Sequence, residues 1–305
     1  MKILSTFEGH PGGMTAVITD SGLGGLLICA QLERRLRGAA GDGPVHLVYV
    51  NAWPDARHGY NDLPDIAARA AVFDRALAAM TAFHPDFVLV ACNTLSVVYE
   101  ATAFSRAPVV PVTGILDVGT DLFHDALTRD PEGVLLLFGT RTTIGSGEHI
   151  SRLAQRGIDR RRIVAEPCHG LAAAIDKDPD SPAVPGLVED CVLRVVPRLP
   201  AGASLGVGLA CTHYGYIAEV FRTALRRHTD AKVEILDPGK RFVDGLTDGL
   251  DRRPSEAGEM PVSVEVVSKV ELPEAQRRAV ARRIEPVSAT TANALLEYRR
   301  IPDLF

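Results

Sequence analysis

The sequence lacks the features that mark several classes of protein. Its five cysteines, in 305 residues, show no framework spacing, so we expect reduced thiols in a cytoplasmic protein rather than disulfides. No apolar run approaches the roughly 20 residues of a membrane-spanning helix, so we expect no membrane association. Residues 1–12 lack the apolar segment of a signal peptide and are interpreted as a short polar leader. The net charge of -5 offers no basic field for nucleic acid.

What the chain does contain is enough apolar material for a sizeable core, because hydrophobic residues make up 46% of it. Short apolar runs, typical of buried strands, alternate with segments of helical spacing from about residue 14 to residue 250. This alternation predicts an α/β protein with mostly parallel sheets covered by helices. A length of 305 residues suits two domains better than one.

Two stretches of the sequence are similar to each other, and the functional hypothesis rests on them. One apolar run leads into Ala-Cys-Asn-Thr at 91–94, and another leads into Ala-Cys-Thr-His at 210–213. Each motif places a cysteine, Cys92 or Cys211, at the carboxyl end of a buried strand, which is where open α/β sheets bind ligands. Nearby donors and the following helix N-terminus favour a thiolate at such a position.

A buried cysteine is also a small apolar side chain that needs no function. We keep this interpretation for Cys29, Cys168 and Cys191. For Cys92 and Cys211 we favour a functional role because their context is duplicated, with one motif in each half of the chain. Two facing domains would bring these cysteines to opposite walls of one cleft.

A glycine-rich turn, Asp-Ser-Gly-Leu-Gly-Gly at 20–25, follows the first predicted strand. Its glycines permit close backbone approach and leave helix N-terminal amides free for an anion. The spacing differs from that of the dinucleotide-binding GxGxxG fingerprint. Asp20 is either a helix N-cap or a titrating group beside the site. The second half has a counterpart in Thr140, Thr143 and Ser146, whose hydroxyls either bind an anion or cap a helix.

These motifs resemble, in order and spacing, those of the glutamate racemase family. The resemblance includes Gly-Thr-x-x-Thr-Ile-x-Ser at 139–146 and the tyrosine after the second cysteine motif. That family lies within the cofactor-independent aspartate/glutamate racemase superfamily, and the match covers about residues 14–245. The resemblance implies two flavodoxin-like α/β domains with the active site in the cleft between them. It also implies a two-base mechanism without pyridoxal phosphate, metal or another cofactor.

On this basis we expect the first domain to comprise residues 1–114 plus 233–250 and to carry Cys92. The second domain is expected to comprise residues 115–232 and to carry Cys211. Residues 251–305 are predicted to form a C-terminal appendage that covers the cleft, packs on the first domain or builds an oligomer contact. A homodimer stays open at this point.

In the family that the chain resembles, the first cysteine takes the α-proton from the D-enantiomer and the second takes it from the L-enantiomer, which implies these roles for Cys92 and Cys211. Asp20 matches the acid near the first cysteine, and His213 matches the partner of the second. Asp176 falls where the family usually has glutamate. The substrate is a small-molecule amino acid, and the residues expected to hold it are Ser21, Tyr60, Asn61, Asn93, Thr94, Thr140, Thr143 and Thr212.

The substrate stays open because the loop Gly-Tyr-Asn at 59–61 stands where the family has Pro-Tyr-Gly, displaced by an apparent insertion. A racemase, epimerase or isomerase of another amino acid or carboxylate in specialised metabolism is the alternative to a glutamate racemase that serves peptidoglycan synthesis. A non-catalytic relative that binds a carboxylate is a second alternative. A zinc site built from Cys211, His213, Cys168 and His169 is the least favoured, because no closed four-ligand spacing is present.

Overall fold

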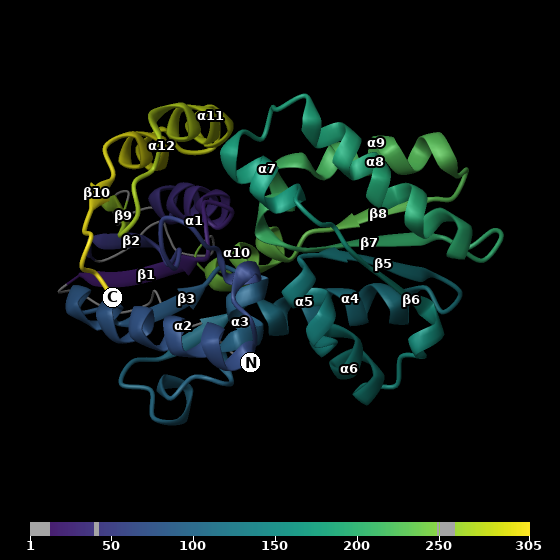
Figure 1. The fold of residues 1–305 in the computed structure, drawn as a ribbon, viewed down its shortest axis with the longest axis horizontal. Helices are drawn as coiled ribbons and strands as arrows, with labels where there is room; N and C mark the ends of the chain where they lie inside the picture. The colour runs from purple at the N-terminus through teal and green to yellow at the C-terminus, as the bar shows by residue number, and fades with distance from the viewer. Residues whose placement is uncertain (1–12, 40–42, 249, 251–259) are drawn as a thin grey trace.

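The computed structural model describes residues 13–39, 43–248, 250 and 260–305. The expected leader and the start of the expected appendage lie outside that part of the chain. Two α/β domains stand side by side, one built mainly from the two ends of the chain and the other from its middle (Figure 1). All strand pairings in the described residues are parallel. The predicted fold class, two domains with mostly parallel sheets, is therefore confirmed.

The first domain is organised around a six-stranded sheet in the order β10-β9-β2-β1-β3-β4. Its central strands are apolar and almost wholly buried, as a sheet covered by helices on both faces requires. The strands are β1 Met14–Asp20, β2 Val45–Asn51, β3 Phe87–Val90, β4 Val112–Gly114, β9 Val262–Ser268 and β10 Arg299–Arg300. The helices are α1 Leu26–Arg37, α2 Ile66–Met80, α3 Asn93–Tyr99, α10 Pro238–Thr247, α11 Glu274–Ile284 and α12 Ala289–Leu296.

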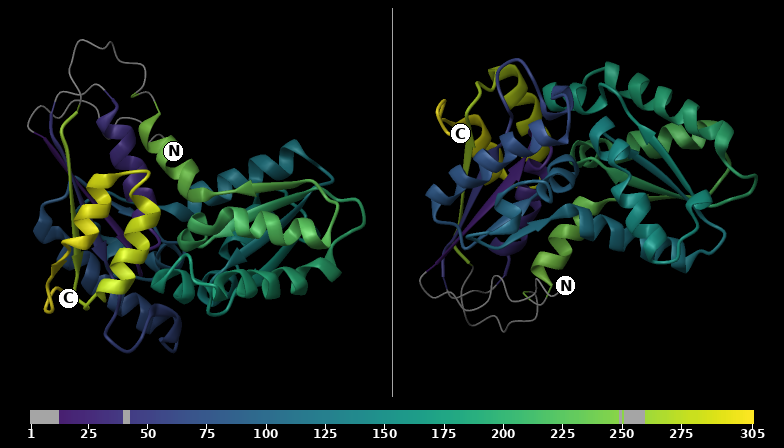
Figure 2. Two further views of the ribbon diagram at one scale, coloured as in Figure 1. Left: turned by 90° about the horizontal axis from the view of Figure 1, so that it is seen from above. Right: turned by 60° about the horizontal axis from the view of Figure 1, so that its bottom comes forward.

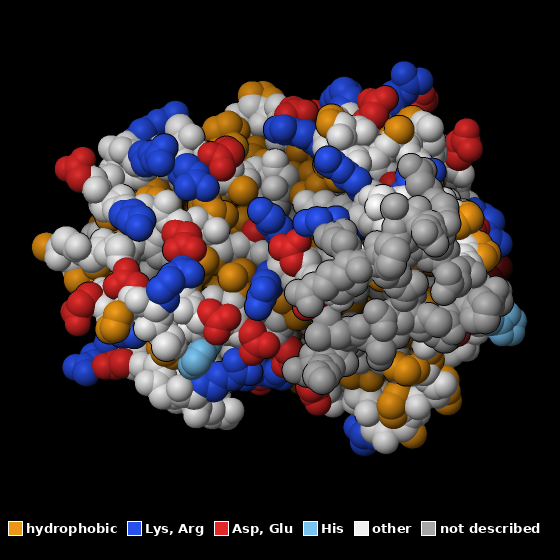
Figure 3. Space-filling view, turned by 180° about the vertical axis from the view of Figure 1, so that it is seen from behind, with side chains coloured by type: hydrophobic (Ala, Val, Ile, Leu, Met, Phe, Trp, Pro, Cys, Tyr) orange, Lys and Arg blue, Asp and Glu red, His pale blue; other side chains and the backbone are white. Residues whose placement is uncertain are grey.

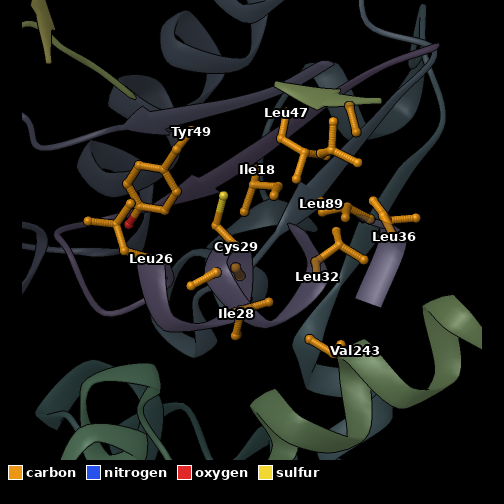
Figure 4. Packing of buried hydrophobic residues seen from close by; sticks show 14 of the residues in the cluster. Ile18, Leu26, Ile28, Cys29, Leu32, Leu36, Leu47, Tyr49, Leu89 and Val243 are labelled. Atoms are coloured by element: carbon orange, nitrogen blue, oxygen red, sulfur yellow. The ribbon is translucent and has the colours of Figure 1, made fainter. Parts of the chain in front are cut away.

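A hydrophobic core lies between this sheet and α1. Ile18 and Leu47 of the strands face Cys29 and Leu32 of the helix (Figure 4). Cys29 is fully buried there, in agreement with its interpretation as an apolar side chain. Tyr49 lies in the same core, and its hydroxyl donates to the carbonyl oxygen of Gly22 at 2.6 Å. This hydrogen bond attaches the glycine-rich turn at residues 20–25 to the core.

The second domain has a four-stranded sheet in the order β6-β5-β7-β8. Alternate residues of β5 face opposite layers: Phe138 packs with α8 and α9, whereas Leu137 packs with Phe123 of α4. The strands are β5 Val134–Gly139, β6 Ile163–Pro167, β7 Leu205–Ala210 and β8 Val233–Leu236. The helices are α4 Ile115–Arg129, α5 Arg141–Ser146, α6 Glu148–Gln155, α7 Leu171–Lys177, α8 Ala183–Val195 and α9 Ala218–His228.

The structure divides the stretch 233–250, which we expected in the first domain. β8 pairs with β7 and belongs to the second sheet. Only the following helix, α10, packs on the first domain, where Phe242 and Val243 join the core around α1. The chain therefore returns from the second domain to the first between β8 and α10. A four-residue apolar strand carries no signal of which sheet it joins, because its partner lies far away in the sequence.

Of the roles expected for the C-terminal segment, its described part, residues 260–305, packs on the first domain, where it also adds a strand to the sheet. β9 pairs with the whole length of β2, and α11 and α12 bury Val280, Ile284 and Leu295 in the same core. Without β9, β2 would be an open edge with unpaired backbone groups. Figure 2 shows this segment lying against the first domain from two further directions.

The outer surface carries charges of both signs. On the face shown in Figure 3, acidic and basic side chains are interspersed over the second domain. None of the described helices is long and apolar enough to cross a membrane. A hollow that combines reactive side chains from both domains lies between them, at the carboxyl ends of β1, β3, β5 and β7.

Candidate active site

A cavity of about 170 Å³ lies between the two domains. Parallel strands bring their carboxyl ends to one edge of a sheet, and here the edges of two sheets face each other. Most of the residues predicted from the sequence meet in its wall, where they are Asp20, Ser21, Tyr60, Asn61, Cys92, Asn93, Thr94, Thr140, Asp176, Cys211, Thr212 and His213. Thr143 lies behind this wall, where it supports Thr94 and Thr140. Ser146 also lies outside the wall, and its hydroxyl donates to the carbonyl oxygen of Thr143.

The two cysteines of the duplicated motif occupy equivalent positions. Cys92 follows β3 and caps α3, with φ -151° and ψ 123°. Cys211 follows β7 and begins a turn of 3-10 helix, with φ -153° and ψ 128°. Both are nearly buried, at 4% and 5% exposure. The two halves therefore present a thiol to the same cavity from the same backbone conformation.

The surroundings of Cys92 favour a protonated thiol. Its sulfur accepts from the amide of Leu95 at 3.4 Å and lies 3.3 Å from the Ser21 hydroxyl. Burial raises the pKa of Cys92 well above its ordinary value, and the nearby charge of Asp20 raises it further. Burial also raises the pKa of Asp20, although His213 and the Thr212 hydroxyl, which donates to Asp20 Oδ2 at 2.7 Å, partly offset this.

The surroundings of Cys211 are different because a histidine pairs with it. His213 Nδ1 lies 3.7 Å from Cys211 Sγ, and His213 Nε2 lies 2.7 Å from Asp176 Oδ1. Burial lowers the pKa of His213, but hydrogen bonds to Asp176 and Cys211 outweigh it, so the pKa stands well above its ordinary value. An imidazolium therefore sits beside Cys211, whereas the group beside Cys92 is the carboxyl of Asp20.

The glycine-rich turn lets these groups come together. A Cβ placed on Gly22 would lie 2.7 Å from Asp176 Oδ1, and one placed on Gly24 would lie 2.6 Å from His213 Nδ1. Real side chains do not approach that closely, so a residue larger than glycine would push the His213 loop away. The turn that was predicted as an anion site is thus also where the first domain packs against His213 of the second domain.

Polar contacts tie the domains together around the cavity. Thr94 Oγ1 lies 2.9 Å from Thr140 Oγ1 and 3.2 Å from Thr143 Oγ1. Asn61 Oδ1 accepts from both the amide and the hydroxyl of Thr142. Asn61, which was predicted to bind the substrate, therefore uses its side-chain oxygen in hydrogen bonds to the second domain. Its side-chain nitrogen is left for a ligand.

Two buried polar atoms in the cavity wall have no hydrogen-bond partner among the described residues: the Tyr60 hydroxyl and Asn93 Nδ2. Buried polar groups are rarely left unpaired in folded proteins, because an unmade hydrogen bond costs about 1–3 kcal/mol. Both side chains line the cavity and are therefore available to a polar ligand.

Several residues of the site were not predicted. Trp53 and Arg141 line the cavity, as does His169, which the sequence had suggested only as a zinc ligand. Arg141 Nη2 lies 3.5 Å from His169 Nδ1. Arg141 was within reach of sequence reasoning, because it follows Thr140 in a motif already singled out. His149 lies behind Asn93 and orients its amide through a 3.2 Å contact between His149 Nε2 and Asn93 Oδ1, and no local pattern marks it.

The side chains suggested as zinc ligands face other partners. The two ring nitrogens of His213 face Cys211 and Asp176, whereas Cys168 Sγ faces the carbonyl oxygen of Glu166. In the described part of the chain, no group of three or more histidine, cysteine, aspartate or glutamate side chains could hold a metal ion.

The comparison with known proteins defines the class. The family model described as Asp/Glu/Hydantoin racemase matches residues 23–245, and the chain belongs to that family. Among its curated relatives, the glutamate racemase of Ruegeria sp. (strain TM1040) is 31% identical over 263 residues, which are 80% of this chain and 88% of that protein.

Solved structures of glutamate racemases share the fold. The RacE1 isoform from Bacillus anthracis superimposes with a TM-score of 0.67 at 19% identity, covering 90% of this chain and 94% of that one. The enzyme from Francisella tularensis, solved in complex with D-glutamate, gives a TM-score of 0.65 at 17% identity, covering 90% and 95%. The two-domain architecture predicted from the resemblance is therefore that of known glutamate racemases.

His149 supplies a test of the site's burial. Burial lowers the pKa of His149 to about 3, and Arg152 contributes. The folded chain keeps this ring neutral while the unfolded chain takes up a proton below about pH 6.5, so the free energy of unfolding falls as the pH drops from there towards 3. We expect His149 to account for a loss of about 2 kcal/mol at pH 5.

Urea denaturation of the wild type and of His149→Asn, at about pH 7.5 and pH 5, checks this expectation. The wild type should lose about 2 kcal/mol more than the variant between the two pH values. Equal losses in both proteins would show that His149 is protonated in the folded chain.

Proposed function

We propose that this protein is a glutamate racemase that works by two-base proton transfer between Cys92 and Cys211. The observation that carries the proposal is the pair of thiols at one cavity with opposite electrostatic surroundings. Cys92 lies beside Asp20 in an environment that favours the thiol, and Cys211 lies beside the His213 imidazolium. A racemase needs this inequality, because one sulfur must accept a proton while the other donates one.

The reaction begins with L-glutamate and Cys211 as the thiolate. Cys211 takes the α-proton, which breaks the C–H bond and leaves the electron pair delocalised into the α-carboxylate. Cys92 then gives its thiol proton to the opposite face of the α-carbon. The products are D-glutamate, a Cys211 thiol and a Cys92 thiolate, and the same steps in reverse convert D-glutamate to L-glutamate. Asp20 lies near the Cys92 end and His213 near the Cys211 end of this transfer.

The α-proton of an amino acid is very weakly acidic, so the site must stabilise the carbanion in a place that excludes water. The unpartnered Tyr60 hydroxyl and Asn93 amide belong to residues that line the cavity, and both groups can donate a hydrogen bond to such a charge. Arg141 favours a substrate with a second carboxylate, because it lines the cavity and forms no ion pair to a carboxylate within the described residues. The relatives named glutamate racemase support the same substrate.

Substrate and role can be tested together. We expect L-glutamate to lose optical activity with the purified protein and no added cofactor, and glutamine to react at least about tenfold more slowly because it lacks the second carboxylate. Expression of the chain should also let a bacterium that requires D-glutamate grow without it, consistent with a cytoplasmic supply for peptidoglycan. Faster turnover of another amino acid would identify that amino acid as the substrate and overturn the glutamate assignment.

The two-cysteine mechanism predicts that Cys92→Ser and Cys211→Ser each lower the rate of racemisation by about 10²–10⁴-fold, the usual contribution of a general acid or base. A serine hydroxyl has nearly the size of a thiol but is a far weaker acid, so the loss reflects proton transfer rather than packing. Polarimetry in both directions measures the rate.

Cys29→Ala is the matched control, because Cys29 is buried in the core of the first domain and away from the cavity. It should keep full activity with a small loss of stability. Wild-type activity in either serine variant, with the fold intact by circular dichroism, would contradict the mechanism.

A further inference from the structure

The C-terminal helix α11 reaches across to the second domain at the site. Gln276 lies in the first turn of α11 and is half-buried. Its side-chain Nε2 donates to Asp176 Oδ2 at 2.6 Å. Asp176 lies on α7 of the second domain, and α7 and α11 are neighbours at the top of the junction between the domains (Figure 1).

Asp176 is held at both of its carboxylate oxygens. Oδ1 accepts from the Leu23 amide at 2.7 Å and faces His213 Nε2 at 2.7 Å. Oδ2 is the oxygen that Gln276 holds. A carboxylate held through one oxygen only can rotate about its terminal bond, whose torsional preference is broad. The contact from Gln276 therefore fixes the plane of the carboxylate and, through it, the imidazole of His213.

We propose that Gln276 is a positioning residue for proton transfer at Cys211, acting through Asp176 and His213. This inference rests on the proposed function and adds a residue that neither touches the reacting atoms nor lines the cavity itself. Aspartate is one methylene shorter than the glutamate usual in the family at this place. Gln276 supplies a donor to this shorter side chain from the other domain.

A second contact between α11 and the second domain provides a matched control. Arg283, further along α11, pairs with Asp180 at 2.6 Å, and both side chains are partly exposed. This pair joins the same helix to the second domain without touching Asp176. Removing it weakens the attachment of α11 and leaves the carboxylate held at both oxygens.

The test must separate the two directions of the reaction. L- and D-glutamate have equal free energies, so kcat/KM is equal in both directions for any variant. The primary isotope effect is not bound by this rule, because the bond to deuterium breaks at Cys211 for the L-enantiomer and at Cys92 for the D-enantiomer. A defect at Cys211 makes the first step rate-limiting for L-glutamate.

We expect Gln276→Leu, which keeps a similar size but donates no hydrogen bond, to lower kcat/KM about tenfold in both directions. The deuterium isotope effect on kcat/KM should rise with α-deuterated L-glutamate and fall with α-deuterated D-glutamate. Arg283→Ala should match the wild type in both. A loss of rate with unchanged isotope effects, or no loss at all, would overturn the positioning role.

A measurement without substrate keeps this test apart from that of the proposed function. Nitrogen-15 NMR titration follows the His213 ring, whose charged neighbours are Asp176, Cys211 and Asp20. In Gln276→Leu the ring should lose its proton at lower pH than in the wild type or Arg283→Ala. The same midpoint in all three proteins would refute the inference even if the wild type does not racemise glutamate.

Discussion

The buried contact between His213 and Asp176 is the interaction on which the rest of the site depends. Their side chains are 8% and 14% exposed, and moving such charges out of water costs several kcal/mol per ion unless further hydrogen bonds compensate. The Leu23 amide and Gln276 provide those bonds. They come from a turn and a helix of the first domain, so the charge pair of the second domain is complete only when the domains meet.

This constraint explains why the two halves look alike in backbone and differ in chemistry. Cys92 and Cys211 have nearly the same φ and ψ, and each follows a buried parallel strand. The side chains two positions from each cysteine are different: Thr94 joins a cluster of hydroxyls, whereas His213 brings an imidazolium to Cys211. The proposed chemistry needs a similar placement of two sulfurs and an unequal charge beside them, and the fold supplies both.

Local features of the site were predictable from the sequence. The strands before Cys92 and Cys211, the turn after β1 and helix α1 all depend on residues close together in the chain, so apolar runs and glycine spacing were enough. The same holds for Thr140, whose hydroxyl caps α5 by accepting from the amide of Thr143.

Features that depend on distant partners were not predictable in this way. β8 could have joined either sheet, and the C-terminal segment became part of the first domain because β2 offered it an edge. The amide of Asn61 is used by Thr142 of the other domain, 81 residues away in the chain. Gln276 meets Asp176 across 100 residues. Each of these contacts is set by how the two sheets face each other, which no local pattern encodes.

Proton NMR during racemisation of L-glutamate in deuterated buffer is the most direct test of the central claim that two thiols act on opposite faces. Early in the reaction, the account predicts that D-glutamate carries deuterium at its α-carbon while the remaining L-glutamate keeps its α-proton. This pattern arises because Cys211 removes the proton and Cys92 delivers a different one from solvent. D-glutamate that retains the original proton would mean that a single base carries it from face to face, and would contradict the account.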